Sequence, residues 1–322
     1  MSQAPLQKAV EPESLRQQEE EKWRLMNDAG TEEYLPPEKL AKKIATGALP
    51  DRFVMPTENL KNTIHLVAQS KGGSGKTFVA STLAGFFARH VPDLSLYCFD
   101  LDSNKRSFAA FQAFNVMQIS EIGSHKGEIV IDPSRFDKAF NSVLEEIDED
   151  AIVVMDTGAG TSFWSLVRYL SDLDYPALCR SCGDREWRFI IDVVVSGNAV
   201  QESKDTIERL RKYMDSPFVE YIIWGNEYFG YLDKVYDEII AEYGDMFKRS
   251  VNLPMVTNNT LNKLLRFMRE NNLSASEMFM CDSLTKIQKT YITQYYYGND
   301  GGKSGVFRAL QNLDWSPKAQ LG

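Results

Sequence analysis

The sequence predicts an α/β fold, in which a mostly parallel sheet is covered by helices on both of its faces. Three observations lead to this prediction. Short, nearly continuous apolar runs alternate with segments that have helical spacing. A glycine-rich loop joins the first apolar run to the first helical segment, and the C-terminal third is mainly helical in its pattern.

The apolar runs and the helical spacing define the individual elements. The expected strands are 63–69, 94–99, 151–155, 189–195 and 219–224. The expected helices are 75–90, 136–147, 201–214, 232–243, 258–271, a segment around 284–295, and 306–313. We divide the chain into a polar N-terminal extension (1–60, with short helices at 14–26 and 36–44), a main domain (61–297), and a hinge with a short helix (298–322).

Composition excludes several classes of protein. The chain has 36 Lys and Arg against 45 Asp and Glu, a net charge of −9, which argues against coating by nucleic acid along its whole surface. No apolar run reaches the ~18–20 residues that cross a bilayer, and no signal peptide is visible. Four cysteines are too few for a disulfide scaffold. We therefore expect a cytoplasmic protein without a transmembrane segment.

The strongest motif runs from Lys71 to Thr77, with the sequence KGGSGKT, between an expected strand and an expected helix. This is the context of a phosphate-binding loop. Gly72, Gly73, Ser74 and Gly75 would turn backbone N–H groups toward a phosphate, and the helix N-terminus adds partial positive charge. Lys76 would reach the β- and γ-phosphates, and Thr77 would ligate Mg²⁺. The alternative is a glycine-rich turn that contains Lys and Thr by chance.

Three carboxylates follow expected strands. Asp102 lies past a strand end, where it can orient a water for in-line attack on a γ-phosphate. Asp100 could hold waters of the metal or cap the strand end. Asp156 would hold Mg²⁺ through a water, or cap the helix expected to begin near Thr161, and both roles are compatible.

Together these motifs identify a resemblance to the ParA/MinD family of ATPases. KGGSGKT fits the deviant Walker A pattern K-G-G-x-G-K-[ST], because the position of the usual first glycine holds Ser70 and a second lysine, Lys71, precedes the glycines. The segment 99–102 (FDLD) resembles the family's D-x-D motif, 153–158 (VVMDTG) its Walker B strand, 219–226 its later strand ending in Asn, and 253–254 (LP) its Ile-Pro. The resemblance covers about 63–271.

The resemblance implies a function. Asp102 would be the catalytic carboxylate, and Asn226 would contact the base. Lys71 would reach across a dimer to the partner's nucleotide, so that hydrolysis needs two ATP-loaded subunits; the alternative is that Lys71 serves only its own subunit. Asn104-Lys105 does not continue as the guanine-reading N-K-x-D sequence, which favours ATP. Ser103-Asn104 stands where the family usually has Pro-Gln.

The implied partners are a second copy of the chain, a protein that stimulates hydrolysis, and DNA bound without sequence specificity. Plasmid or chromosomal DNA would be the cargo, with a conjugation, secretion or other surface machine as the next candidate. Two other classes remain: a metabolic phosphotransferase or ligase, and a scaffold that binds ATP with little hydrolysis.

Four weaker features have plainer explanations. Two expected helices have a basic face that could contact DNA but is more simply explained as a face toward solvent. Helix 258–271 has Lys263, Arg266 and Arg269, and helix 201–214 has Lys204, Arg209, Arg211 and Lys212. Cys179 and Cys182 form a lone C-x-x-C without a second pair at metal spacing, which predicts two loop thiols. The sequence GGKS at 301–304 imitates a phosphate loop but predicts a hinge. Segment 306–313 carries one basic residue, so we expect it to dock on the protein rather than on a membrane.

Overall fold

The computed structural model describes residues 53–102, 107–118, 123–125, 128–130, 134–181, 185–298 and 305–317. The two short helices predicted within the N-terminal extension, the loop 301–304 and the Ser103-Asn104 pair lie outside these residues.

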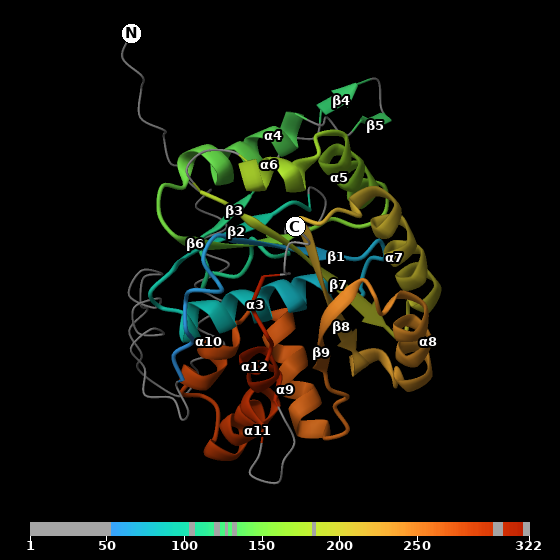
Figure 1. Ribbon diagram of the computed structural model, residues 1–322. Coiled ribbons are helices and arrows are strands. Elements are labelled where there is room, and N and C mark those ends of the chain that lie inside the picture. Colours follow the sequence, from blue (N-terminus) through green and yellow to red (C-terminus); the bar gives the residue numbers. More distant parts are fainter. Residues whose placement is uncertain are drawn as a thin grey trace.

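A seven-stranded parallel sheet forms the centre of the molecule, in the order β3-β2-β6-β1-β7-β8-β9 (Figure 1). Its strands are β1 (Thr63–Ala68), β2 (Ser95–Asp100), β3 (Val116–Gln118), β6 (Ala151–Asp156), β7 (Arg188–Ser196), β8 (Val219–Asn226) and β9 (Phe247–Leu253). β1 lies between β6 and β7 and is buried along its whole length, as expected for a strand covered on both faces. A separate antiparallel pair consists of β4 (Gly123–His125) and β5 (Glu128–Val130).

Helices cover both faces of the sheet and enclose two apolar cores (Figure 1). One face carries α3 (Lys76–His90), α9 (Asn259–Glu270), α10 (Ala275–Met280), α11 (Lys286–Tyr297) and α12 (Val306–Gln311). The other face carries α4 (Ser134–Asn141), which continues as a π-helical turn (Ser142–Glu146), α5 (Thr161–Asp172), α6 (Tyr175–Ser181), α7 (Val200–Met214) and α8 (Asp233–Tyr243). The α/β prediction and the helical C-terminal region are confirmed.

The carboxyl ends of the strands meet at one edge of the sheet, because the strands are parallel. The phosphate-loop candidate leaves β1 at this edge and leads into α3. β2, β6 and β8 end here with Asp100, Asp156 and Asn226. An open parallel sheet binds its ligands at this edge, so the fold brings the predicted site residues to one place.

Four of the described strands were not predicted from the sequence: β3 and β9 of the central sheet, and the separate pair β4 and β5. β9 is an edge strand with the sequence FKRSVNL, in which charged residues interrupt the apolar pattern that predicts a buried strand. Arg249 of β9 is buried, and its guanidinium lies 2.8 Å from the Glu220 carboxylate of β8. Glu220 also pairs with Arg188 of β7 at 2.9 Å. Because the Glu220 carboxylate neutralises both guanidinium groups, a strand that contains Arg249 can be buried beneath helices.

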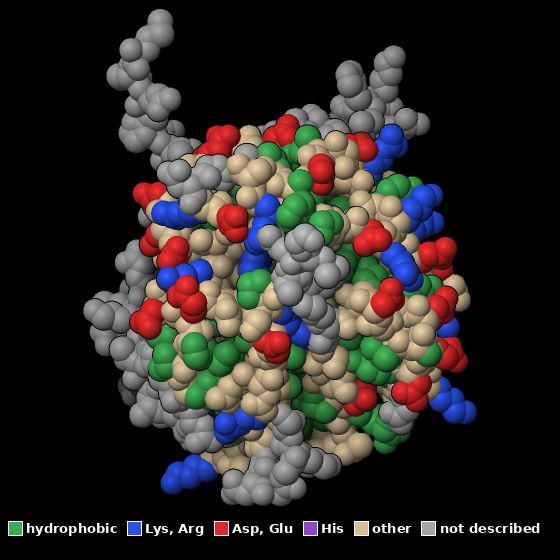
Figure 2. All heavy atoms as spheres, in the orientation of Figure 1, with side chains coloured by type: hydrophobic (Ala, Val, Ile, Leu, Met, Phe, Trp, Pro, Cys, Tyr) green, Lys and Arg blue, Asp and Glu red, His purple; other side chains and the backbone are tan. Residues whose placement is uncertain are grey.

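The surface carries charges of both signs. On the face shown in Figure 2, acidic and basic side chains are interspersed. Among the described residues, every helix is too short or too polar to span a bilayer. Val306, Phe307 and Leu310 of α12 are buried against the rest of the chain, which confirms that this helix docks on the protein.

Candidate nucleotide site

The loop between β1 and α3 has the backbone geometry of an anion-binding turn. Gly73 and Gly75 have φ angles of +77° and +104°, which residues with a Cβ atom rarely adopt. A Cβ on Gly75 would also collide with the side-chain amide of Asn226. Asn226 Nδ2 donates to the Ser74 carbonyl at 2.8 Å, so the end of β8 holds the loop directly. Glycine at position 75 is therefore required twice, by conformation and by space.

Lys76 lies against the loop that precedes it. Its side chain is buried, and Nζ donates to the Lys71 carbonyl oxygen at 3.2 Å. The Ser74 hydroxyl donates to the same oxygen at 3.1 Å. The ammonium group is thus placed at the turn where a cradle of backbone N–H groups would receive phosphate.

Thr77 and Asp156 form a direct contact at the start of α3. Thr77 Oγ1 donates to Asp156 Oδ2 at 2.6 Å, and the carboxylate is buried. Burial raises the pKa of Asp156 well above its usual range, while the Thr77 hydrogen bond and the charge of Lys76 act in the opposite direction. Asp156 Oδ1 is buried without a hydrogen-bond partner in the described part of the chain. A buried unsatisfied carboxylate oxygen beside a hydroxyl fits the oxygen ligands that Mg²⁺ takes, directly or through water.

Asp100 and Asp102 have different environments. Asp100 is completely buried, and its oxygens accept backbone N–H groups of Asp102, Phe108 and Ala109 at 2.9–3.0 Å. Burial raises its pKa, and these hydrogen bonds lower it. Asp102 instead lines the cavity beside the loop. Of the two roles weighed for Asp100, capping the strand end has structural support, and Asp102 is the carboxylate available to a ligand.

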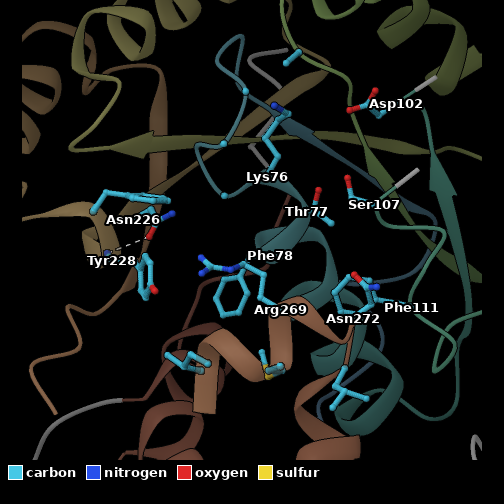
Figure 3. Close-up of a pocket in the computed structure, with 18 of the residues that line it drawn as sticks. Lys76, Thr77, Phe78, Asp102, Ser107, Phe111, Asn226, Tyr228, Arg269 and Asn272 are labelled. Atoms are coloured by element: carbon cyan, nitrogen blue, oxygen red, sulfur yellow. Dashed lines mark hydrogen bonds between the residues drawn. The ribbon is translucent and has the colours of Figure 1, made fainter. Parts of the chain in front are cut away.

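A cavity of about 410 Å³ joins these groups. Figure 3 shows Asn226 and Tyr228 on one side and Asp102 and Ser107 on the other, with Lys76 and Thr77 at the loop between them. The wall opposite the loop is largely apolar. It comes from α3, α9, the turn between α9 and α10, α11 and the segment after β2: Phe78, Phe111, Leu265, Met268, Leu273 and Tyr295. Small-molecule sites in proteins have this size and this mixture of apolar walls and a few polar groups.

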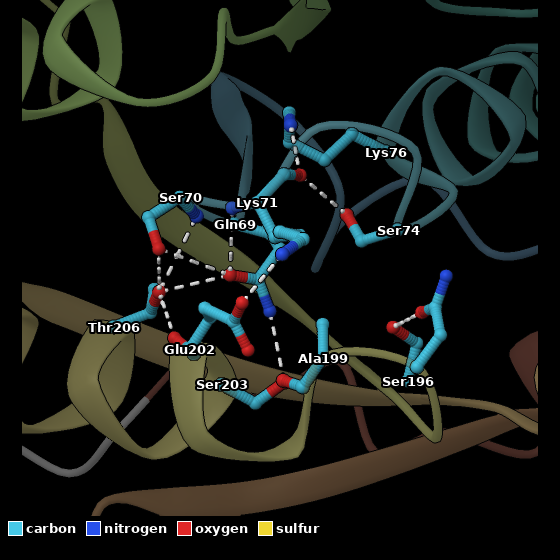
Figure 4. Close-up of polar contacts among 11 residues, drawn as sticks. Gln69, Ser70, Lys71, Ser74, Lys76, Ser196, Ala199, Glu202, Ser203 and Thr206 are labelled. Carbon is cyan, nitrogen blue, oxygen red and sulfur yellow. Dashed lines mark hydrogen bonds and ion pairs between the residues drawn. The ribbon is translucent and has the colours of Figure 1, made fainter.

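Lys71 contacts its own chain. Its ammonium lies 2.6 Å from the Glu202 carboxylate of α7, and both side chains are partly exposed. A buried hydrogen-bond network fixes the same junction (Figure 4), in which Thr206 Oγ1 donates to Gln69 Oε1 at 2.9 Å and Gln69 Nε2 donates to Ser203 Oγ at 2.9 Å. The start of the loop is thus held on α7, while Lys71 itself points along the surface.

Comparisons with known proteins found two similar sequences. Two proteins from Escherichia coli called "Protein TraL" match: one is 25% identical over 227 residues, covering 69% of this chain and 89% of its own length. The other is 28% identical over 167 residues, covering 52% and 64%. No family model matches.

Solved structures give looser matches. The MinC:MinD cell division complex of Aquifex aeolicus is 14% identical with a TM-score of 0.40, covering 77% of this chain and 95% of that chain. A plasmid partition protein of Borrelia burgdorferi is 17% identical with a TM-score of 0.37, covering 68% and 99%. Superpositions this loose carry no argument about function. The chain's own geometry, a parallel sheet with the KGGSGKT loop between β1 and α3, is a P-loop α/β fold.

Several contacts of this site were not predicted. No sequence motif marked the contacts made by Gln69, Glu202 and Thr206. A weak signal was present on α7, because Ser203 and Thr206 are three residues apart and their hydroxyls therefore lie on one face of the helix. Arg269 is exposed, as predicted for the basic face of this helix, but it also lines the cavity, four residues after Leu265, and this second position was not predicted. That spacing was a usable signal.

The basic residues predicted on α7 and the thiol of Cys179 lie outside the cavity. On α7, Lys204 pairs with Glu238 at 2.6 Å and Arg211 with Asp245 at 3.0 Å. Arg209 and Lys212 lie over the rings of Trp164 and Tyr213. Cys179 is buried in α6 rather than in a loop, so that prediction was wrong for this thiol, and Cys182 lies outside the described residues. Among the described residues, no group of three or more His, Cys, Asp or Glu side chains is placed to hold a metal ion by itself.

Thr77→Ala tests the metal assignment. Removal of the hydroxyl leaves the N–H cradle and Lys76 in place, so ATP binding without Mg²⁺ should change by no more than about twofold. The strengthening of ATP binding by Mg²⁺ should largely disappear, because one oxygen ligand and the partner of Asp156 are lost. Calorimetric titration of ATP with and without MgCl₂ measures both quantities. Thr82→Ala, farther along α3, is the matched control.

Proposed function

We propose that the chain is a Mg²⁺-dependent ATPase that forms a dimer around ATP and acts as a positioning switch. The observation that carries the proposal is the convergence of the loop, Thr77 and Asp102 on one cavity at the carboxyl edge of the sheet. A glycine-rich turn that contained Lys and Thr by chance would not explain this convergence with a separate carboxylate.

The chain's own residues divide the work of binding. The backbone N–H groups of 72–77 and the Lys76 ammonium would hold the β- and γ-phosphates, and Asn226 would fix the loop beneath them. Thr77, with Asp156 behind it, would hold Mg²⁺. The metal would neutralise charge on the phosphate oxygens.

Hydrolysis would depend on Asp102. Its carboxylate would orient a water toward the γ-phosphorus, the water oxygen would form the new P–O bond, and ADP would leave as the bond to the β-phosphate oxygen breaks. Asp100 would keep Asp102 in position through the backbone N–H of Asp102, at 3.0 Å. Asp102 would be a catalytic residue and Asp100 a positioning residue.

Lys71 would act in the partner subunit. In the single chain it pairs with Glu202, and both groups are partly exposed. A partly exposed ion pair of this kind contributes only about 0–1 kcal/mol, so it would not prevent Lys71 from moving to a stronger site between two sets of phosphates. Dimerisation around ATP would therefore release Lys71 from Glu202.

A protein machine is a better candidate cargo than DNA. The cations of α7 pair with carboxylates or lie on aromatic rings of the same chain. On α9, Lys263, Arg266 and Arg269 are all exposed, and Arg269 also lines the nucleotide cavity, where a bound nucleotide would compete with DNA for it. We therefore place the switch at a conjugation, secretion or other surface machine in the cytoplasm, with plasmid or chromosomal DNA as the second candidate.

A turnover assay tests the function. The full chain with ATP and Mg²⁺ should release phosphate slowly, and a protein partner or DNA should raise the rate. Phosphorylation of a small metabolite would instead support a phosphotransferase, and tight ATP binding without turnover would support a scaffold. Repeating the assay with double-stranded DNA separates the two cargo classes, because a DNA-positioning switch should be stimulated and a machine-positioning switch should not.

A further inference from the structure

Arg269 is a second cation beside this cavity. It is exposed, lies on the last turn of α9, lines the same cavity as the phosphate loop, and has no ion pair among the described residues. Its guanidinium carbon lies 5.2 Å from the centre of the Tyr228 ring. Asn262, Leu265 and Arg269 are spaced i, i+3 and i+7, so all three lie on the helix face turned toward Tyr228 and the cavity.

Tyr228 is held in place from both ends. Its hydroxyl donates to Asn262 Oδ1 at 3.1 Å, and its backbone N–H donates to Asn226 Oδ1 at 3.2 Å. Asn226 in turn donates to the loop at Ser74. The ring therefore has a fixed position relative to the phosphate loop, and Figure 3 shows Arg269 beside it, close to Phe78.

The same contacts use part of the hydrogen-bonding capacity of the Asn226 side chain. Its oxygen accepts from Tyr228, one of its amide hydrogens is directed at Ser74, and the side chain is buried. One amide hydrogen and one lone pair of the oxygen remain, on a side chain that is buried and held in place. The larger surfaces that a base entering the cavity would meet are two flat faces, the guanidinium of Arg269 and the ring of Tyr228. Guanidinium and aromatic faces are the protein groups on which nucleobases stack.

We propose that Arg269 and Tyr228 form the stacking platform for the base of the bound nucleotide, which rests on the proposed function of this site. The platform supplies affinity for the base by stacking and by the attraction between a cation and a π-face. Because every base has such a face, the pair strengthens ATP and GTP binding alike and does not itself choose between them.

Calorimetric titration of the full chain tests the platform. Arg269→Ala should weaken ATP and GTP binding by about tenfold or more, the range of a lost base stack. It should leave the affinity for inorganic tripolyphosphate, which has no base, within about twofold of wild type. Arg269→Lys keeps the charge without the flat face and should lose most of the same affinity. Arg266→Ala, an exposed arginine on the same helix, is the matched control.

Three results would overturn the platform. Arg269→Ala could bind ATP like wild type, or lose tripolyphosphate affinity as much as ATP affinity, which would make Arg269 a phosphate contact. Tyr228→Ala, with a melting curve to confirm folding, could bind ATP like wild type. A wild-type chain that binds neither ATP nor tripolyphosphate would be a different result, because it overturns the proposed function together with the platform.

Discussion

Asp102→Ala should bind ATP with nearly wild-type affinity and hydrolyse it at least ~10²-fold more slowly, the scale of a lost general base or water-orienting group. Asp102 lines the cavity beside the loop, whereas the oxygens of Asp100 are engaged by backbone N–H groups. The carboxylate of Asp102 is therefore the one that can reach a water. Phosphate release at saturating ATP gives the rate, and calorimetry gives the affinity.

Two companion variants sharpen this test. Asp102→Asn keeps the shape of the side chain without its charge and should be as slow as Asp102→Ala. Asp172→Ala removes an exposed aspartate of α5 far along the chain and should hydrolyse ATP normally. Normal turnover by Asp102→Ala would show that another group orients the water, and the assignment of the two carboxylates would be wrong.

Lys76→Ala should lose nucleotide binding, with an affinity at least ~10²-fold weaker than wild type. The variant removes the cation placed at the turn of the loop, and phosphate charge is the main feature that such a pocket recognises. Two contributions disappear together: the charge-assisted hydrogen bonds to the β- and γ-phosphates, and the favourable field in a buried site, where charges interact more strongly than in water.

Calorimetry with ATP and with tripolyphosphate measures the loss, which should be similar for both probes. Lys204→Ala, which removes a lysine paired with Glu238 on α7, is the control and should bind both probes like wild type. ATP binding by Lys76→Ala at wild-type affinity would refute the assignment of the phosphate loop.

Local sequence patterns predicted most of the fold and part of the site. KGGSGKT carries its geometry within seven residues, and Gly75 adopts the positive φ that the motif requires. Asp102 and Asp156 could be placed together because the ends of parallel strands share one edge. The apolar runs of β1, β6, β7 and β8 are continuous because helices cover both faces, and this made them visible in the sequence.

Long-range pairing explains what the sequence did not reveal. Arg249 belongs to a covered strand only because Glu220 of a neighbouring strand neutralises it. Lys71 meets Glu202 across 131 residues of sequence, and Tyr228 meets Asn262 across 34, so neither contact has a local signature. The position of Arg269 was available from helical spacing, but its partner Tyr228 becomes evident only when α9 is packed beside the end of β8.

The pairing of two chains around ATP is the central feature of the proposed switch, and Lys71 tests it. Lys71 precedes the glycines and lies on Glu202, so Lys71→Ala should leave Lys76 and the cradle intact and still bind ATP. Two sets of phosphates would then face each other without a cation in a partly desolvated interface, where repulsion is stronger than in water.

Light scattering of wild type and Lys71→Ala, each with ATP and Mg²⁺ and each with ADP, is the most direct measurement. Glu202→Gln serves as a control that frees Lys71 without removing it. The account predicts that wild type and Glu202→Gln are dimers in ATP and monomers in ADP, and that Lys71→Ala is a monomer in both and hydrolyses no ATP. A wild-type chain that stays monomeric in ATP, or a Lys71→Ala chain that dimerises and hydrolyses like wild type, would contradict it.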